Sequence, residues 1–269
     1  SADGTADAVR SQFPAVQLAE LTRNTGGAGG FAYGTALAIA AGADLIWLMD
    51  DDTVPEPGAL QALLQARARH AAPAPAVVAS QVVWTDGSPH PMNTPRVKPL
   101  ATRSERAAAA AVGCQPIRSA SFVSVLIEAA GCERRGLPRA DYFLWNDDFE
   151  FTARLLRGRA GLLCPASVVV HKTAAFGSTD LDPGPRFFYE VRNKIWTLRS
   201  AGPLAPVERV LYGGSTLRRW GRTFLRSSDR GALGRSLLRG IVAGVRTSPR
   251  PTEDVLAGFG LTLPRRIGS

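Results

Sequence analysis

The chain has 269 residues, of which 45% are hydrophobic and 20% are charged, and its formal net charge is +9. A chain of this length can bury a sizeable core in one large or two small domains. No uninterrupted apolar run reaches the roughly eighteen residues of a membrane-spanning helix, and the N-terminal "SADGTADAVR" lacks a signal-peptide pattern, which places the chain in the cytoplasm by default. Three widely spaced cysteines fit neither a disulfide framework nor a zinc site.

Helical and extended patterns alternate along residues 1–200, in the order expected for an α/β sandwich with a mainly parallel sheet. Helical patterns cover residues 6–12, 29–41, 57–70, 128–135, 149–157 and 186–200, and extended patterns cover residues 15–21, 44–49, 77–84, 122–127 and 162–170. Between them, residues 85–99 contain four prolines and are expected to form a long loop. We therefore expect one α/β domain over residues 1–200 and a separate helical region over residues 201–269.

The excess positive charge lies in that C-terminal region. Residues 199–269 hold thirteen arginines and four acidic residues, whereas the two signs balance in residues 1–198. Apolar residues recur at helical spacing between the arginines, as in "LRRWGRTFLR" (residues 217–226). This pattern is typical of helices that contact an anionic membrane surface, or of helices packed on the main domain with a solvated arginine face. Nucleic acid is not expected as a partner because no nucleic-acid-binding motif accompanies the charge.

Three adjacent acids follow the apolar strand pattern in "WLMDDDTVPE" (residues 47–56). In open α/β sheets ligands bind beyond the carboxyl ends of the strands, where Asp50, Asp51 and Asp52 are placed. Adjacent carboxylates repel one another, so a divalent cation bound to phosphate oxygens of a nucleotide diphosphate is expected to share the site. The alternative is an acidic turn that caps the following helix.

A second acidic cluster, "LWNDDFEFTARL" (residues 144–155), precedes a helix. Acids at a helix N-terminus are favoured by the macrodipole, but capping accounts for one acid better than for three. A carboxylate here can act as a general base toward an acceptor hydroxyl, and Trp145 offers a flat face for a sugar ring, or else is a core residue. His171 follows the last strand pattern and is a candidate third metal ligand.

The stretch "LTRNTGGAGGFAYG" (residues 21–34) has glycines at the start of a predicted helix. Free backbone N–H groups at a helix N-terminus bind anions, but close packing of the helix on a sheet produces the same pattern. The spacing matches neither a dinucleotide fingerprint nor a P-loop.

In their order and spacing, "RNTGGAGG", "WLMDDD", "WNDDFE" and a His after a strand resemble the inverting glycosyltransferases of family two, which have a GT-A fold. Together with "YEVRNKIW" (residues 189–196), they are similar to the actinobacterial galactofuranosyltransferases that begin cell-wall galactan (arabinogalactan) synthesis. This resemblance implies a UDP-galactofuranose donor, a polyprenyl-diphosphate-linked acceptor ending in rhamnose, and peripheral attachment to the inner face of the plasma membrane.

The resemblance also implies roles for individual residues. Asp50, Asp52 and His171 would hold Mn²⁺ or Mg²⁺, and Asp148 would be the general base. The implied donor-binding residues are Arg23, Asn24, Gly26, Gly27 and Asp51, and the implied acceptor-binding residues are Trp145, Asp147 and Glu150. Arg192 and Asn193 would contact the diphosphate or order a loop over it, unless they are a surface arginine and a capping asparagine.

The resemblance also implies a leading strand, helix and strand that build the uracil pocket, and the given sequence begins after the place where they are expected, so it is either part of a longer chain or has an incomplete pocket. Two alternatives stay open. One is a dTDP-rhamnose-dependent rhamnosyltransferase of the same fold, and the other is a non-catalytic binding protein that has lost its nucleotide half. All of the acids and the histidine needed for catalysis are retained, which favours an enzyme.

Overall fold

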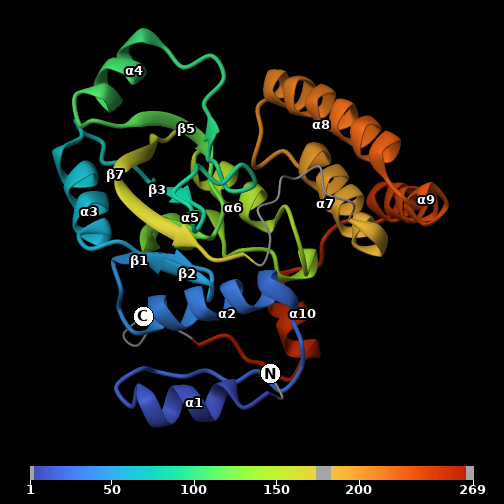
Figure 1. The fold of residues 1–269 in the computed structure, drawn as a ribbon, viewed down its shortest axis with the longest axis horizontal. Helices are drawn as coiled ribbons and strands as arrows, with labels where there is room; N and C mark the ends of the chain where they lie inside the picture. The colour runs from blue at the N-terminus through green and yellow to red at the C-terminus, as the bar shows by residue number, and fades with distance from the viewer. Residues whose placement is uncertain (1–2, 174–182, 265–269) are drawn as a thin grey trace.

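A seven-stranded mixed sheet forms the centre of the fold in the computed structural model, which describes residues 3–173 and 183–264 (Figure 1). Six strands follow the order β1-β6-β3-β7-β5-β4, and β2 pairs with the end of β7. The strands are β1 (Leu45–Met49), β2 (Thr53–Pro55), β3 (Val77–Val83), β4 (Arg96–Val97), β5 (Gln115–Ser119), β6 (Ser124–Glu128) and β7 (Gly161–His171).

The α/β class is confirmed, but the expectation of a mainly parallel sheet is wrong. Among the described strand pairings, only β3 with β7 is parallel. β1 and β3, which are connected through a helix, run in the same direction, but β6 lies between them and runs antiparallel to both. The sheet is mixed because β5 and β6, which the short segment 120–123 joins, both run opposite to the parallel pair β3 and β7, and β6 pairs between β1 and β3.

Helices cover both faces of the sheet. The first seven are α1 (Thr5–Gln12), α2 (Gly26–Ala40), α3 (Ala59–Arg69), α4 (Arg103–Ala110), α5 (Ala129–Arg135), α6 (Asp147–Leu155) and α7 (Phe187–Arg199). Alternate residues of the central strands enter two cores, since successive side chains of a strand point to opposite faces. Val125 and Ile127 pack with residues of α2, α5 and α6, whereas Leu126 packs with residues of α3 and α4.

Three further helices, α8 (Pro206–Arg226), α9 (Arg230–Arg246) and α10 (Thr252–Gly258), complete the described chain. α9 packs closely along α7, because a Cβ at Gly240 or Gly244 would lie within 3 Å of Val191 or Ile195 respectively. α10 packs on α2 below the sheet (Figure 1). Within the described ranges, no helix combines the length and apolar character needed to cross a membrane.

The sequence patterns located most elements and missed some. Residues 15–21 form no strand, and their side chains are largely exposed. The helix α4 and the strands β2 and β5 were not predicted, and β4 lies inside the expected loop of residues 85–99. α4 is an alanine-rich helix begun by a capping box at Thr102 and Glu105, whereas β2, β4 and β5 are short segments whose pairing depends on distant partners.

Candidate active site

The acidic turn after β1 lies beside the end of β7. Asp50 and Asp52 occupy the turn between β1 and β2, and β2 pairs antiparallel with β7 so that Thr53 lies opposite His171. His171 Nε2 is 2.9 Å from Asp52 Oδ1 and 4.0 Å from Asp50 Oδ2. One ligand atom from each of Asp50, Asp52 and His171 lies within 4.8 Å of the others, so the three can coordinate a single ion.

The surroundings of these three side chains fit a divalent cation. Asn93 Oδ1 lies 2.9 Å from His171 Nδ1, and a proton donated from Nδ1 to this oxygen leaves Nε2 free as a ligand. Burial and the neighbouring carboxylates, Asp52 first among them, raise the pKa of Asp50 to about 7, as expected for negative charge without a compensating cation. Two carboxylates and one imidazole form a mainly oxygen donor set, which suits Mn²⁺ and, less closely, Mg²⁺.

Asp147 and Asp148 begin α6 and face the same cavity. Burial, followed by the charge of Asp148, raises the pKa of Asp147 to about 8. Burial also raises the pKa of Asp148, against the opposing effect of the Phe149 backbone N–H, which donates to Asp148 Oδ1 at 2.6 Å. A carboxylate with raised proton affinity is a stronger general base than an exposed aspartate, provided that it is ionised at the working pH.

The loop before α6 has an unusual backbone conformation. Phe143, Trp145 and Asn146 all have φ near +64°, a region that non-glycine residues seldom occupy. The side-chain amide of the buried Asn193 on α7 lies within 2.9 Å of the carbonyls of residues 142, 144 and 145, and it donates to this group of acceptors. Asn146 Nδ2 donates to Glu190 on the same helix at 2.7 Å. These contacts hold the strained loop and thereby fix where α6 begins.

Arg192 and Gly26 brace the same loop. Arg192 donates to the carbonyls of Asp141 and Tyr142, and Arg192 and Asn193 therefore order a loop in this structure. A Cβ at Gly26, where φ is +68°, would lie 2.1 Å from the Phe143 carbonyl oxygen. At this position the glycine-rich segment serves the close approach of α2 to the loop.

A cavity of about 690 Å³ brings half of the predicted site residues together. Its lining includes Asp50, His171, Asp147, Asp148 and Trp145, together with Gly27 at the start of α2. Asp51 and Asp52 are in the adjoining turn but do not line the cavity. Arg23, Asn24 and Gly26 lie outside the lining as well. Asn24 Oδ1 accepts the Gly26 N–H at 2.8 Å in the turn that leads into α2.

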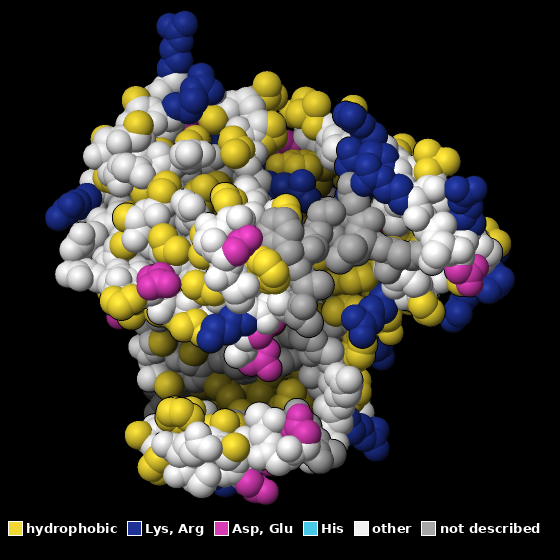
Figure 2. Space-filling view, in the orientation of Figure 1, with side chains coloured by type: hydrophobic (Ala, Val, Ile, Leu, Met, Phe, Trp, Pro, Cys, Tyr) yellow, Lys and Arg dark blue, Asp and Glu magenta, His cyan; other side chains and the backbone are white. Residues whose placement is uncertain are grey.

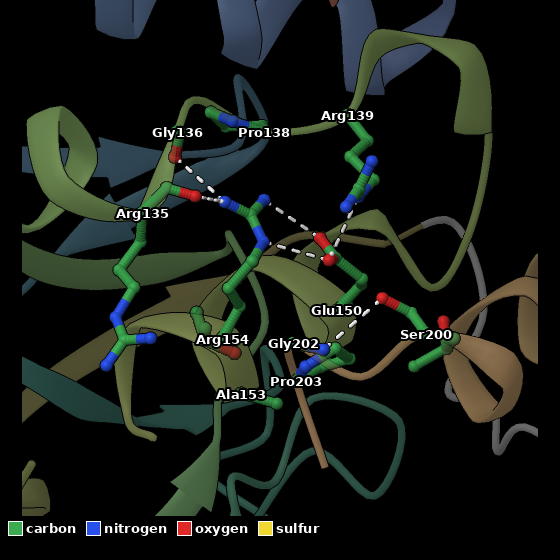
Figure 3. A network of polar contacts seen from close by, with 12 residues as sticks. Arg135, Gly136, Pro138, Arg139, Glu150, Ala153, Arg154, Ser200, Gly202 and Pro203 are labelled. Carbon is green, nitrogen blue, oxygen red and sulfur yellow. Dashed lines mark hydrogen bonds and ion pairs between the residues drawn. The ribbon is translucent and has the colours of Figure 1, made fainter. Parts of the chain in front are cut away.

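Glu150 is placed differently from the expectation. Its side chain is fully buried, and its two oxygens accept hydrogen bonds from Arg154 at 2.9 Å each and from Arg139 at 3.1 Å (Figure 3). Arg154 also donates to the carbonyls of residues 135–137. Glu150 therefore stabilises the packing beneath α6 and does not reach a sugar in the cavity.

Several cavity residues were not found from the sequence. Asn93 is in the proline-rich loop, where nothing marks it as a partner of His171. Glu190 and Lys194 on α7 are spaced four residues apart and so share one face of the helix. This spacing is visible in "YEVRNKIW" and could have predicted that the two side chains lie on the same side. Trp220 and Arg219 reach the cavity from α8, far along the chain.

Comparison with known proteins identifies the family. The sequence profile described as "Glycosyl transferase family 2" matches residues 1–124. Two proteins named galactofuranosyltransferase GlfT1, from two strains of Mycobacterium tuberculosis, are 31% identical over 195 residues, which is 67% of this chain and 63% of theirs. The chain belongs to glycosyltransferase family 2. This is the family that the order of the sequence motifs predicted.

A further relative is the galactofuranosyltransferase GlfT1 of Mycolicibacterium smegmatis, 29% identical over 211 residues, or 71% of this chain and 68% of that one. The chain spans less than two thirds of the length of the M. tuberculosis relatives. Among solved structures, the crystal structure of GalNAc-T7 with UDP, GalNAc and Mn²⁺ matches 71% of this chain and 38% of that chain, with a TM-score of 0.48 and 15% identity.

Proposed function

We propose that this chain is a metal-dependent inverting galactofuranosyltransferase. It would transfer galactofuranose from UDP-galactofuranose to a polyprenyl-diphosphate-linked rhamnosyl acceptor in the synthesis of cell-wall galactan. The observation that carries the proposal is that Asp50, His171 and Asp148 line a single cavity. Family membership supports the transferase chemistry, and the GlfT1 relatives support the choice of sugar.

In this proposal one group of residues assists the departure of the diphosphate, and Asp148 activates the attacking hydroxyl. Mn²⁺ or Mg²⁺ held by Asp50, Asp52 and His171 would neutralise charge that develops on the leaving diphosphate. Asp148 takes the proton of the acceptor hydroxyl as that oxygen attacks the anomeric carbon. The bond from this carbon to the diphosphate oxygen breaks on the opposite face, so the configuration inverts and UDP leaves. Trp145 would pack on a sugar ring, and Asp147 would hold a proton toward a sugar oxygen.

The C-terminal helices supply a surface suited to a lipid-linked acceptor. On α8, five exposed apolar residues fall on one side of the helix, because they are separated by about one or two helical turns: Val207, Val210, Leu211, Leu217 and Leu225. Figure 2 shows Lys and Arg side chains gathered beside hydrophobic ones over α8 and α9. We propose that this face rests on an anionic membrane surface, because arginines there attract lipid phosphates while the apolar residues enter the interface.

The test is turnover of UDP-galactofuranose on a synthetic lipid-linked rhamnosyl disaccharide, with Mn²⁺ present or chelated. We expect product only with metal, and a loss of at least 100-fold in kcat for Asp148→Asn, since general-base catalysis contributes about 10²–10⁴-fold. Asp254→Asn, which changes an exposed acid on α10, is the matched control and should keep full activity. Activity that survives Asp148→Asn would mean that another residue is the base. Product formed only with dTDP-rhamnose would overturn the assignment of UDP-galactofuranose as the donor.

A further inference from the structure

The cavity has two ends of opposite charge. One end is lined by Asp50 and His171, and Asp52 lies beside them in the adjoining turn. The other is lined by cationic side chains from three separate elements, Arg96 on β4, Lys194 on α7 and Arg219 on α8. Asp148 interacts with both ends, since its charge raises the pKa of Asp50 while Arg96 and Lys194 favour its own ionised form. The proposed base therefore lies between the metal-binding group and a basic subsite.

Among these three cations, Lys194 gives the strongest indication of a bound anion. It is 6% exposed, and within the described chain its ammonium group has no hydrogen-bond or ion-pair partner. Its Nζ lies 4.1 Å from the centre of the Phe149 ring. Burial lowers its pKa to about 8, and Arg219 and Arg96 act in the same direction. A buried cation is costly unless an anion accompanies it.

The neighbouring acids Glu190 and Asp148 favour the charged form of Lys194, but neither forms an ion pair with it among the described contacts. Glu190 is bound by Arg219 through an ion pair, and it also accepts hydrogen bonds from Trp220 Nε1 at 3.1 Å and Asn146 Nδ2 at 2.7 Å. The guanidinium group of Arg96 likewise has no hydrogen-bond or ion-pair partner among the described residues, and Arg96 is exposed on β4. With Arg219 paired, Arg96 and Lys194 leave the subsite with more positive than negative charge.

We propose that Arg96, Lys194 and Arg219 form a second anion subsite, which binds the phosphate or diphosphate group of the acceptor. The assignment to the acceptor rests on the proposed function, in which the donor diphosphate is bound at the acidic end with the cation and Asp148 separates donor from acceptor. Arginine and lysine are the usual ligands of phosphate groups. What the subsite adds to the proposed function is a set of residues that would contact the diphosphate of the acceptor, a contact that a free oligosaccharide does not make.

The first test measures binding without turnover. Inorganic pyrophosphate is titrated into the protein by calorimetry with EDTA present, so that no metal holds the anion at the acidic end. We expect the double variant Arg96→Gln, Lys194→Met to bind pyrophosphate about 10- to 100-fold more weakly, the range for lost hydrogen bonds to a charged group. Arg103→Gln, an exposed arginine on α4 outside the cavity, is the matched control and should bind like the wild type. Equal binding by the double variant and the control would overturn the subsite.

The second test identifies which substrate uses the subsite. KM is compared for a lipid-diphosphate acceptor and for a neutral alkyl glycoside of the same glycan. We expect the double variant to raise KM for the diphosphate acceptor about 10- to 100-fold and to leave KM for the neutral acceptor and for the donor unchanged. A rise confined to donor KM would assign the cations to the donor and overturn the proposal. Because pyrophosphate binding needs no sugar donor, failure of the proposed transfer is distinguishable from failure of the subsite. The variant should fold, since Lys194→Met removes an unpaired buried charge, and thermal unfolding verifies this.

Discussion

The buried carboxylate of Glu150 offers a direct test of whether the second acidic cluster is wholly catalytic. Glu150 is 0% exposed and is paired through both oxygens with Arg154, itself nearly buried. Glu150→Gln removes the negative charge and leaves the Arg154 guanidinium buried and unpaired. Breaking a buried ion pair in this way costs about 3–5 kcal/mol. For a chain of this size that corresponds to a fall of roughly 6–20 °C in Tm.

The assay combines thermal unfolding with acceptor kinetics at low temperature, where the variant stays folded. We expect a lower Tm with an unchanged acceptor KM. Arg139→Met is the graded comparison, because this partner is 32% exposed and donates one hydrogen bond at 3.1 Å, so its loss should cost only about 0.2–1 kcal/mol. Glu56→Gln, an exposed acid, should leave both quantities unchanged. A Glu150→Gln variant with normal Tm and raised acceptor KM would refute this reasoning and return Glu150 to the acceptor site.

Four other changes have defined outcomes. Because the pKa of Asp50 is raised to about 7, Mn²⁺ must displace a proton below that pH, so its calorimetric Kd should fall with rising pH and level off above about 7. Asn193→Ala leaves loop carbonyls without a donor, and we expect a loss of about 1–3 kcal/mol in unfolding free energy and a reduced kcat. The pKa of Asp147 is raised in the fold to about 8, so the native state holds this proton more tightly than the unfolded chain does, and stability falls as pH rises toward 8. Asp147→Asn should therefore raise Tm at pH 8 and make Tm less dependent on pH. An unchanged Tm profile would contradict this expectation. Leu217→Glu with Leu225→Glu should abolish sedimentation with vesicles rich in anionic lipid, and retained binding would argue against the α8 face.

Local sequence patterns predicted much of the fold and part of the site. The strand that ends at Met49 was located from its apolar run, and the helix that begins at Asp147 was located with its start two residues late, because these patterns depend on residues close in sequence. The direction of β6 was not predictable, since it depends on which distant strands pair with it. The same limit hid Asn93, whose side chain contacts His171 across 78 positions of the sequence.

The sequence by itself determined the family and the chemical groups available to it: paired acids after β1, paired acids at the start of α6, and a histidine at the end of β7. Only the tertiary structure decided how these groups are used. Pairing of β2 with β7 places His171 beside Asp52, packing beneath α6 buries Glu150 against Arg154, and the approach of α7 and α8 turns Lys194 and Arg219 toward the cavity. The physical reason is that residue type and periodicity set local structure, whereas burial, pairing and charge compensation arise between segments far apart in the chain.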